Sequence, residues 1–358
     1  GTASRALDLI RYLIIDFQSS NNLPKPITMC AIPIFRLMLS SKDGSTISSG
    51  SSVVTSLLRS AKSQILESKI NGQPVLQVIG QIVIRILGPN VSDSGAMNAG
   101  ELVTELIFGM NKAIGDAGTK KVIYTVIVRL AHAKMSGLVS SLVTFLARMT
   151  NKMGAKRFFD YIGSMHVVVN EKKVNGAAVV LQMWSKHFEG FFSGFNRKIC
   201  VVAMGKMLLE DQRIYAMSTQ MERLTKSQGS GRYATRSKTK VVVKTISMAT
   251  RMAELLCKEF KEAYVEATLA AENNDEDEDT CDLSDYILSA RPDINMEAEE
   301  NPEIKKDPLF SLELIKHIPK VFQTLARKAE GKMLKAIQGQ MTPDAIESLQ
   351  AALGAPTS

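Results

Sequence analysis

Cysteine is scarce in this chain of 358 residues, and its four cysteines show no metal-binding or disulfide pattern. Cys30, Cys200, Cys257 and Cys281 lie far apart and include no CxxC spacing. Zinc sites and disulfide frameworks usually show closely spaced cysteines. The sequence therefore argues against both kinds of site, and it is consistent with a reducing compartment.

Long apolar runs are also missing. No stretch approaches the roughly 18 uninterrupted apolar residues that indicate a transmembrane helix, and the apolar segment 122–130 is interrupted by Arg129. We therefore predict no membrane span and no membrane partner. The chain begins at Gly1, without methionine or a secretory signal, and runs directly into an amphipathic segment. This start suggests an excised fragment that carries a cloning remnant.

Aromatic residues make up only 6 % of the chain, and there are only 11 prolines. By contrast, 45 % of the residues are hydrophobic, and 18 residues are methionine. Such a composition allows a large, aliphatic and adaptable core. It favours helix-on-helix packing over a sheet sandwich.

No convergent catalytic set is recognisable. The histidines lie on separate predicted elements, no HExxH motif is present, and none of the four is near a cysteine: His132, His166, His187 and His317. The segment from Gly229 to Ala234 formally matches G-x-G-x-x-A, but no strand is expected before it, so we interpret it as a flexible linker. We predict that the chain is not an enzyme and has no cofactor, metal site or small-molecule substrate.

Helical periodicity dominates the pattern. Paired helices are predicted to begin near residues 5, 52, 100, 137 and 175. These spacings of roughly 36 to 48 residues are typical of HEAT-type helical hairpins. The second pair is expected to start at a cap formed by Ser51 and Ser52, and a turn is expected at Asn71 and Gly72. The third pair is predicted at 101–114 and 120–133, joined by residues 115–118. The fourth pair is predicted at 138–149 and 155–162, and the fifth at 175–188 and 192–209. The predicted fold class is all-α, a HEAT-repeat α-solenoid of antiparallel helical hairpins with an armadillo-type fold, and residues 1–217 form the stack.

The remainder of the chain is predicted to alternate between helices and two long loops. Val241, Val242 and Val243 are β-branched, but they lead into apolar residues at helical spacing, and no strand of useful length is expected. The predicted order is a basic Ser/Gly-rich loop at 218–240, one long helix at 241–272, a mobile acidic loop at 273–307, and terminal helices at 308–358 that open at Pro308.

The acidic loop is the most informative feature. Residues 272–307 hold 14 acids and three bases, a net charge of −11, whereas the chain as a whole carries +8. Like charges at this density repel one another and stay solvated. The tract lacks the D-x-[DN]-x-[DN]-G pattern of a calcium loop. The tract could be a solvated loop without a partner. We predict instead that it binds a basic protein. The predicted cargo-binding residues are Glu272, Asp275, Glu276, Asp277, Glu278, Asp279, Asp282 and Asp285.

The basic loop has several possible uses. Residues 223–251 contain eight bases and no acid, and the candidate binding residues are Arg232, Arg236, Lys238 and Lys240. They could contact phosphates of nucleic acid or membrane surfaces, although Tyr233 is the only aromatic residue available for base stacking. They could also pair with the acidic loop when no partner is bound, or simply remain solvated.

A family resemblance rests on motifs that occur in a fixed order. The apolar Val180-Leu181-Gln182-Met183-Trp184 and Phe188-Glu189-Gly190-Phe191-Phe192 come first, followed by the helical segment 198–208. Ile214-Tyr215-Ala216-Met217 and the basic Arg236-Ser237-Lys238-Thr239-Lys240 follow, and Asp307-Pro308-Leu309 closes the acidic loop. In this order they resemble the C-terminal part of nuclear import receptors of the karyopherin-β family, the importins. The resemblance is clearest over residues 179–309.

The resemblance implies a fragment of a superhelix of HEAT repeats that carries basic cargo between cytoplasm and nucleus. Cargo in that family includes core histones and ribosomal proteins. Transport there is controlled by the GTPase Ran, which binds mainly N-terminal repeats that would lie outside this chain, and nucleoporins are further expected partners. Two alternatives remain open from the residues themselves, a nucleic-acid-binding helical scaffold and a purely structural HEAT-repeat scaffold.

Overall fold

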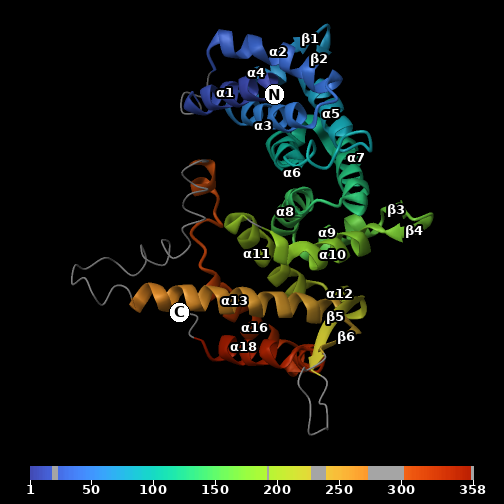
Figure 1. Ribbon diagram of the computed structural model, residues 1–358, viewed down its shortest axis with the longest axis vertical. Helices are drawn as coiled ribbons and strands as arrows, with labels where there is room; N and C mark the ends of the chain where they lie inside the picture. Colours follow the sequence, from blue (N-terminus) through green and yellow to red (C-terminus); the bar gives the residue numbers. More distant parts are fainter. Residues whose placement is uncertain (18–22, 192, 227–238, 273–301, 356–358) are drawn as a thin grey trace. The chain divides into compact units, whose positions relative to one another are not determined.

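The computed structural model of the chain (Figure 1) describes residues 1–17, 23–191, 193–226, 239–272 and 302–355. The described residues are mostly helical, which confirms the all-α prediction. They form two compact units, and each is treated by itself below. Unit 1 comprises residues 1–153 and 157–192, and unit 2 comprises residues 154–156 and 193–358. The stack predicted over residues 1–217 is thus divided after residue 192.

Eight helices of the described part of unit 1 pack in two rows. In one row α1, α3, α6 and α8 contact one another in sequence order, and in the other α2, α5, α7 and α10 do the same. The first row comprises α1 (Thr2–Asp16), α3 (Gly44–Ser60), α6 (Ala99–Thr104) and α8 (Ser136–Met153). The second comprises α2 (Lys25–Ser40), α5 (Val75–Ile86), α7 (Asn111–His132) and α10 (Gly176–His187). Two further helices, α4 (Lys62–Glu67) and α9 (Ala155–Gly163), lie outside these rows.

Capping explains where α3 begins. The side chain of Asp43 accepts a hydrogen bond from Thr46 N at 2.9 Å, as an N-cap residue does. The sequence prediction of a cap at Ser51 and Ser52 was therefore wrong. Ser51 is buried in the middle of α3, and its hydroxyl donates to Ile47 O at 2.8 Å.

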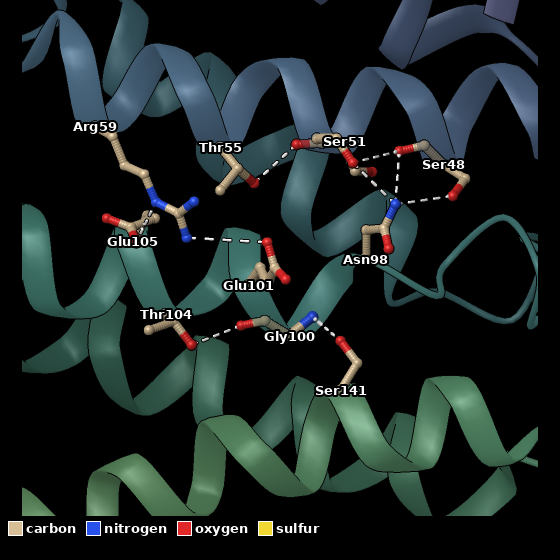
Figure 2. A network of polar contacts seen from close by, with 11 residues as sticks. Ser48, Ser51, Thr55, Arg59, Asn98, Gly100, Glu101, Thr104, Glu105 and Ser141 are labelled. Carbon is tan, nitrogen blue, oxygen red and sulfur yellow. Dashed lines mark hydrogen bonds and ion pairs between the residues drawn. The ribbon is translucent and has the colours of Figure 1, made fainter. Parts of the chain in front are cut away.

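Polar contacts join three successive helices of the first row, α3, α6 and α8 (Figure 2). The side-chain amide of Asn98, just before α6, donates to the Oγ atoms of Ser48 and Ser52 at 3.1 and 2.9 Å. The backbone N–H of Gly100 on α6 donates to Ser141 Oγ on α8 at 2.9 Å. Each contact links residues between 41 and 50 positions apart, which is about the length of one helix pair.

An ion pair supports the same row. Arg59 Nε at the end of α3 lies 2.7 Å from Glu105 Oε1, and Arg59 Nη2 lies 3.9 Å from Glu101 Oε2 (Figure 2). Glu105 begins a π-helical turn, η2 (Glu105–Gly109), which continues α6. The helix predicted over residues 101–114 is therefore interrupted before its expected end.

Two arginines of the second row bind main-chain carbonyls of the preceding helix pair. Arg85 on α5 donates to Met38 O at 2.5 Å. Arg129 on α7 donates to Gly88 O at 3.1 Å and to Val91 O at 2.8 Å. A guanidinium has several donors in a fixed geometry, so one side chain can satisfy more than one carbonyl at the end of a helix.

Arg129 also binds Asp93, which in turn holds the start of the next helix. Arg129 Nη2 lies 2.8 Å from Asp93 Oδ1, and Asp93 Oδ2 accepts from Lys134 N and Met135 N at 2.7 and 3.0 Å. Burial raises the pKa of Asp93, but these two N–H donors and the charge of Arg129 outweigh burial and leave the pKa below its usual value. The Asp93 carboxylate therefore stays charged and links α7 to the segment that leads into α8.

Unit 1 contains two short hairpins, although no strand of useful length was predicted. Residues Lys69–Ile70 (β1) pair with Gln73–Pro74 (β2) across the predicted turn at Asn71 and Gly72, both of which have positive φ. Residues His166–Val169 (β3) pair with Lys172–Asn175 (β4) across Asn170 and Glu171, also with positive φ. Two-residue turns of this kind match the twist of antiparallel strands and therefore close hairpins.

The predicted fourth and fifth helix pairs also need correction. The sequence paired 138–149 with 155–162, and 175–188 with 192–209. In the structure α10 packs against α8 and α7, so it takes the second position that was expected for α9. The helix after it, α11 (Gly194–Glu210), belongs to unit 2. Because the β3–β4 hairpin lies between α9 and α10, pairing the helices simply in chain order gives α8 and α10 the wrong partners.

Unit 2 is built around one long helix, α13 (Met248–Glu272). It contacts α11, α12 (Arg213–Ala216), α16 (Leu314–Arg327), α17 (Lys332–Gln338) and α18 (Pro343–Gly354). Its buried apolar side chains include Met252, Leu255, Leu256 and Phe260. Burial of these large side chains against five neighbours makes α13 the centre of the unit's core.

The predicted loop at 218–240 has strands at both of its ends, and the predicted helix start at residue 241 was wrong. Residues Ser218–Lys226 (β5) pair with Thr239–Ser247 (β6) in an antiparallel ribbon of nine residue pairs. The three β-branched valines at 241–243 favour a strand, because branched side chains fit a pleated ribbon better than a helix. Helix α13 begins only at Met248, where Ser247 Oγ accepts from Thr250 N at 3.0 Å as an N-cap.

The helix predicted to open at Pro308 begins later. Asp307 Oδ1 accepts from Leu309 N at 2.9 Å, and Asp307 O accepts from Phe310 N at 2.9 Å. This local turn uses the backbone groups that a helix would need. The 3₁₀ turn η4 (Pro302–Lys306) precedes it, and α16 starts only at Leu314.

His317 makes the stability of unit 2 depend on pH. Burial, with smaller contributions from Lys320 on α16 and Lys206 on α11, lowers the pKa of His317 from 6.5 to about 4. Its Nε2 has no hydrogen-bond partner among the described residues. Because the unfolded chain binds this proton and the fold does not, stability should fall as pH drops from 6.5 towards 4. A shift of this size corresponds to a loss on the order of 3 kcal/mol.

Urea unfolding at pH 7.5 and pH 4.5 checks this prediction. We expect the midpoint of the unit 2 transition to fall with pH in the parent chain and to fall much less in His317→Gln. An equal fall in both proteins would show that His317 is not the titrating group.

Candidate partner-binding site on α13

The two charged segments of the sequence leave opposite ends of α13 (Figure 1). The β5–β6 ribbon joins the helix at Met248, and the acidic tract leaves it at Glu272. A helix of 25 residues is about 37 Å long. That length is several times the Debye length of about 8 Å at physiological salt. The basic and acidic ends of α13 are therefore electrostatically separate.

Helix α11 holds the middle of α13. Arg197 Nη2 forms an ion pair with Glu259 Oε1, and it also lies 3.4 Å from Glu262 Oε2. Glu259 is only 1 % exposed, so its charge is stabilised by a partner that is itself fixed on a neighbouring helix. The contact fixes the turns of α13 that lead to the start of the acidic tract.

The residue next to Arg197 holds the other flank of the tract. Lys198, 7 % exposed, donates from Nζ to Phe310 O at 2.5 Å. The ring of Phe310 also packs against Phe195 on α11, with ring centroids 6.3 Å apart. Adjacent residues of one helix thus bind the segments before and after residues 273–301. We call Arg197, Lys198 and their partners the α11 anchor.

The C-terminal half of α13 exposes apolar side chains beside the α11 anchor. Tyr264 is 56 % exposed, Val265 48 % and Leu269 54 %, whereas Phe260 one turn earlier is buried. Exposed aromatic and aliphatic side chains next to charged groups are typical of protein interfaces. The acidic end of α13 therefore offers apolar contact area as well as charge.

The predicted site residues are only partly within the described chain. Glu272 is the last residue of α13, and Lys240 lies in β6 opposite Thr225. The other predicted residues lie outside the described residues, namely Asp275, Glu276, Asp277, Glu278, Asp279, Asp282, Asp285, Arg232, Arg236 and Lys238. The structure thus describes the two points from which the predicted binding segments leave α13.

The α11 anchor was missed by the sequence reasoning. Arg197 and Lys198 interrupt an otherwise apolar helical segment, which was a usable signal that their charges are buried and paired. Their partners are 62 and 112 residues further along the chain. Periodicity alone does not identify a partner at such a distance.

A cavity of about 340 Å³ lies between α11, α12 and the start of α17, and it is lined by Glu210, Asp211, Tyr215 and Lys328 among others. Asp211 pairs with Arg213, and Tyr215 donates to Leu208 O, with its pKa raised to about 12 by burial. These groups satisfy one another, so nothing there points to acid–base chemistry.

Among the described residues no group of three or more potential ligands is arranged to hold a metal ion. In the same part of the chain, no helix has both the length and the apolar character needed to cross a membrane. No protein-family model matches the sequence, and no curated protein sequence is significantly similar to it.

Proposed function

We propose that the chain is a HEAT-type solenoid fragment that binds basic cargo proteins at the acidic end of α13. The observation that carries the proposal is the α11 anchor. It fixes both flanks of a segment of net charge −11 to one turn of α11. The segment begins at Glu272, about 37 Å along α13 from the basic ribbon. A strongly charged segment held at both ends, next to exposed apolar side chains, is suited to attract a basic protein and then bind it.

The solenoid part of the proposal is supported by the two helix rows of unit 1. The arginines at positions 85 and 129 are 44 residues apart and make equivalent contacts to the preceding helix pair. Helices α1 and α2 expose the apolar side chains Leu9, Tyr12 and Met29 in addition to their buried faces. A helix that is apolar on two faces is usually buried between two layers of structure. Both features are typical of stacked helical repeats.

The cargo-receptor part of the proposal follows from the sequence resemblance to karyopherin-β import receptors, in particular importin nine. On this proposal the cargo is a histone-like or ribosomal protein, and transport between cytoplasm and nucleus is controlled by Ran. The acidic segment raises the association rate and shields the cargo's positive charge, and this contribution weakens with salt.

A titration with a core histone dimer tests the proposal. The first variant changes Asp275, Glu276, Asp277 and Glu278 to amides, and its control changes the same number of exposed acids in unit 1, Asp16, Glu67, Asp116 and Glu171. We expect the first variant to weaken binding by about tenfold or more at 50 mM salt and to reduce the salt dependence. The control should bind as the parent chain does.

A second variant separates the apolar contribution from the charge. Tyr264→Ser with Leu269→Ser removes exposed apolar area, so it should weaken binding while leaving the salt dependence unchanged. Unchanged affinity and unchanged salt dependence in both variants would remove the acidic end of α13 from cargo binding.

A further inference from the structure

Helix α1 in unit 1 has a second apolar face, which is exposed. Leu9 is 62 % exposed, Tyr12 60 % and Leu13 42 %. Leu7 and Ile14 lie on another face of the helix and are buried, and α1 packs against α3 (Figure 1). Packing within unit 1 thus uses one apolar face of α1 and leaves the other open.

Exposed apolar side chains are concentrated in this part of unit 1. Sixteen large hydrophobic side chains of the described residues are exposed, and seven of them lie within the first 40 residues. Three of the seven, Met29, Ile32 and Leu39, are on α2, which also packs against α3. Single exposed apolar residues are normal on a protein surface, whereas a group of them usually marks a contact surface. The outer face of α1 is therefore a candidate for a protein contact.

A row of four side chains along this face carries opposite charges at its two ends. The row consists of Arg5, Leu9, Leu13 and Asp16, whose spacings of four, four and three residues place them on one side of the helix. It is about 16 Å long. Arg5 and Asp16 are both exposed, and neither has an ion-pair partner among the described residues.

This order of charges is self-complementary when two copies of α1 pair in antiparallel orientation. Arg5 of one copy then lies opposite Asp16 of the other, and the two-fold symmetry repeats the same pair at the other end of the row. Between the two ion pairs, Leu9 of each copy lies against Tyr12 and Leu13 of the other. A parallel pairing would instead bring like charges together at both ends. The charges therefore favour an antiparallel second copy of this chain as the occupant of the face.

We propose that the chain forms a two-fold symmetric dimer through the outer face of α1. All the residues that carry the proposal lie in unit 1, so it goes beyond the cargo binding proposed for unit 2. A contact centred on one helix is small, so we expect a weak dimer with a dissociation constant of about 10–100 µM.

Sedimentation velocity of the full chain under reducing conditions, from about 1 to 200 µM, measures the dimer. Leu9→Glu puts a charge at the centre of the contact in both copies, so it should raise the dissociation constant by about tenfold or more. The matched control is Leu66→Glu on α4, because Leu66 is also exposed, at 43 %, but lies outside the proposed contact. The control should keep the dissociation constant of the parent within about twofold.

Two charge variants test the antiparallel order of the pairs. Arg5→Glu places two acids opposite each other at both ends of the row, so it should weaken the dimer about three- to tenfold. Arg5→Glu combined with Asp16→Lys reverses both charges and restores opposite signs at each end. This double variant should recover the dissociation constant of the parent within about twofold.

Thermal unfolding at about 1 µM, where the parent should be monomeric, shows whether the variants remain folded. We expect the same midpoint for all of them. A parent chain that stays monomeric at the highest concentration would overturn the proposal, and the face would then be left to a further helix pair or to another protein. Equal weakening by Leu9→Glu and Leu66→Glu, or no recovery in the double charge variant, would also overturn it.

Discussion

The substitution Gly100→Ala should lower the free energy of unfolding by about 3 kcal/mol. A Cβ atom at Gly100 would lie 2.0 Å from Ser141 O and 2.4 Å from Ser141 C, which are backbone atoms of α8. Backbone atoms cannot move aside as a side chain can, so α6 and α8 must separate. Separation also lengthens the hydrogen bond from Gly100 N to Ser141 Oγ, now 2.9 Å. Overpacking of this kind usually costs about 1–3 kcal/mol, and sometimes more.

Thermal and urea unfolding measure the effect, with Gly80→Ala as the matched control. Gly80 lies within α5, and no heavy atom lies within 4 Å of a Cβ built there. Its replacement should be neutral or stabilise unit 1 by about 0.5–1 kcal/mol, because alanine favours a helix more than glycine does. If both variants unfold like the parent, the close approach of α6 and α8 at Gly100 is not a constraint.

The second large effect is expected at the α11 anchor. Arg197→Met should destabilise unit 2 by about 3–5 kcal/mol, because it removes the ion-pair partner of Glu259, which is 1 % exposed. The double variant Arg197→Met with Glu259→Leu should recover much of this loss, since it also removes the buried charge. Urea unfolding of the parent, both single variants and the double variant gives the coupling free energy directly.

An exposed ion pair provides the control for this cycle. Lys332 Nζ lies 3.9 Å from Glu330 Oε2, and both side chains are largely exposed. Lys332→Met should change stability by less than about 1 kcal/mol, since exposed pairs contribute little. If Arg197→Met costs no more than Lys332→Met, the α11 anchor does not stabilise the start of the acidic tract.

Much of the helical architecture could be predicted from the sequence, because its physical signal is local. Apolar residues at helical spacing indicated α1, α2, α5, α8 and α10 close to their observed positions. The break at Gly115 was also indicated, and the structure has φ 68° there, within α7. Asn71 and Gly72 indicated a turn, although their strands were not predicted.

The errors lie where local signals compete or where partners are remote. The segment with Val241, Val242 and Val243 is compatible with a helix by spacing and with a strand by branching, and pairing with β5 decides between them. The role of α10 depends on packing against α8, which no periodicity reveals. The α11 anchor depends on contacts across 62 and 112 residues, so its members could be recognised as unusual but not paired.

The contacts of Arg85 and Arg129 with main-chain carbonyls have an evolutionary consequence. A carbonyl oxygen is present whichever amino acid occupies the position, so the acceptors at residues 38, 88 and 91 survive almost any point mutation. Neighbouring helix pairs can then change in sequence while a few arginines preserve their packing. Helix pairs joined in this way can diverge far in sequence and still keep their packing.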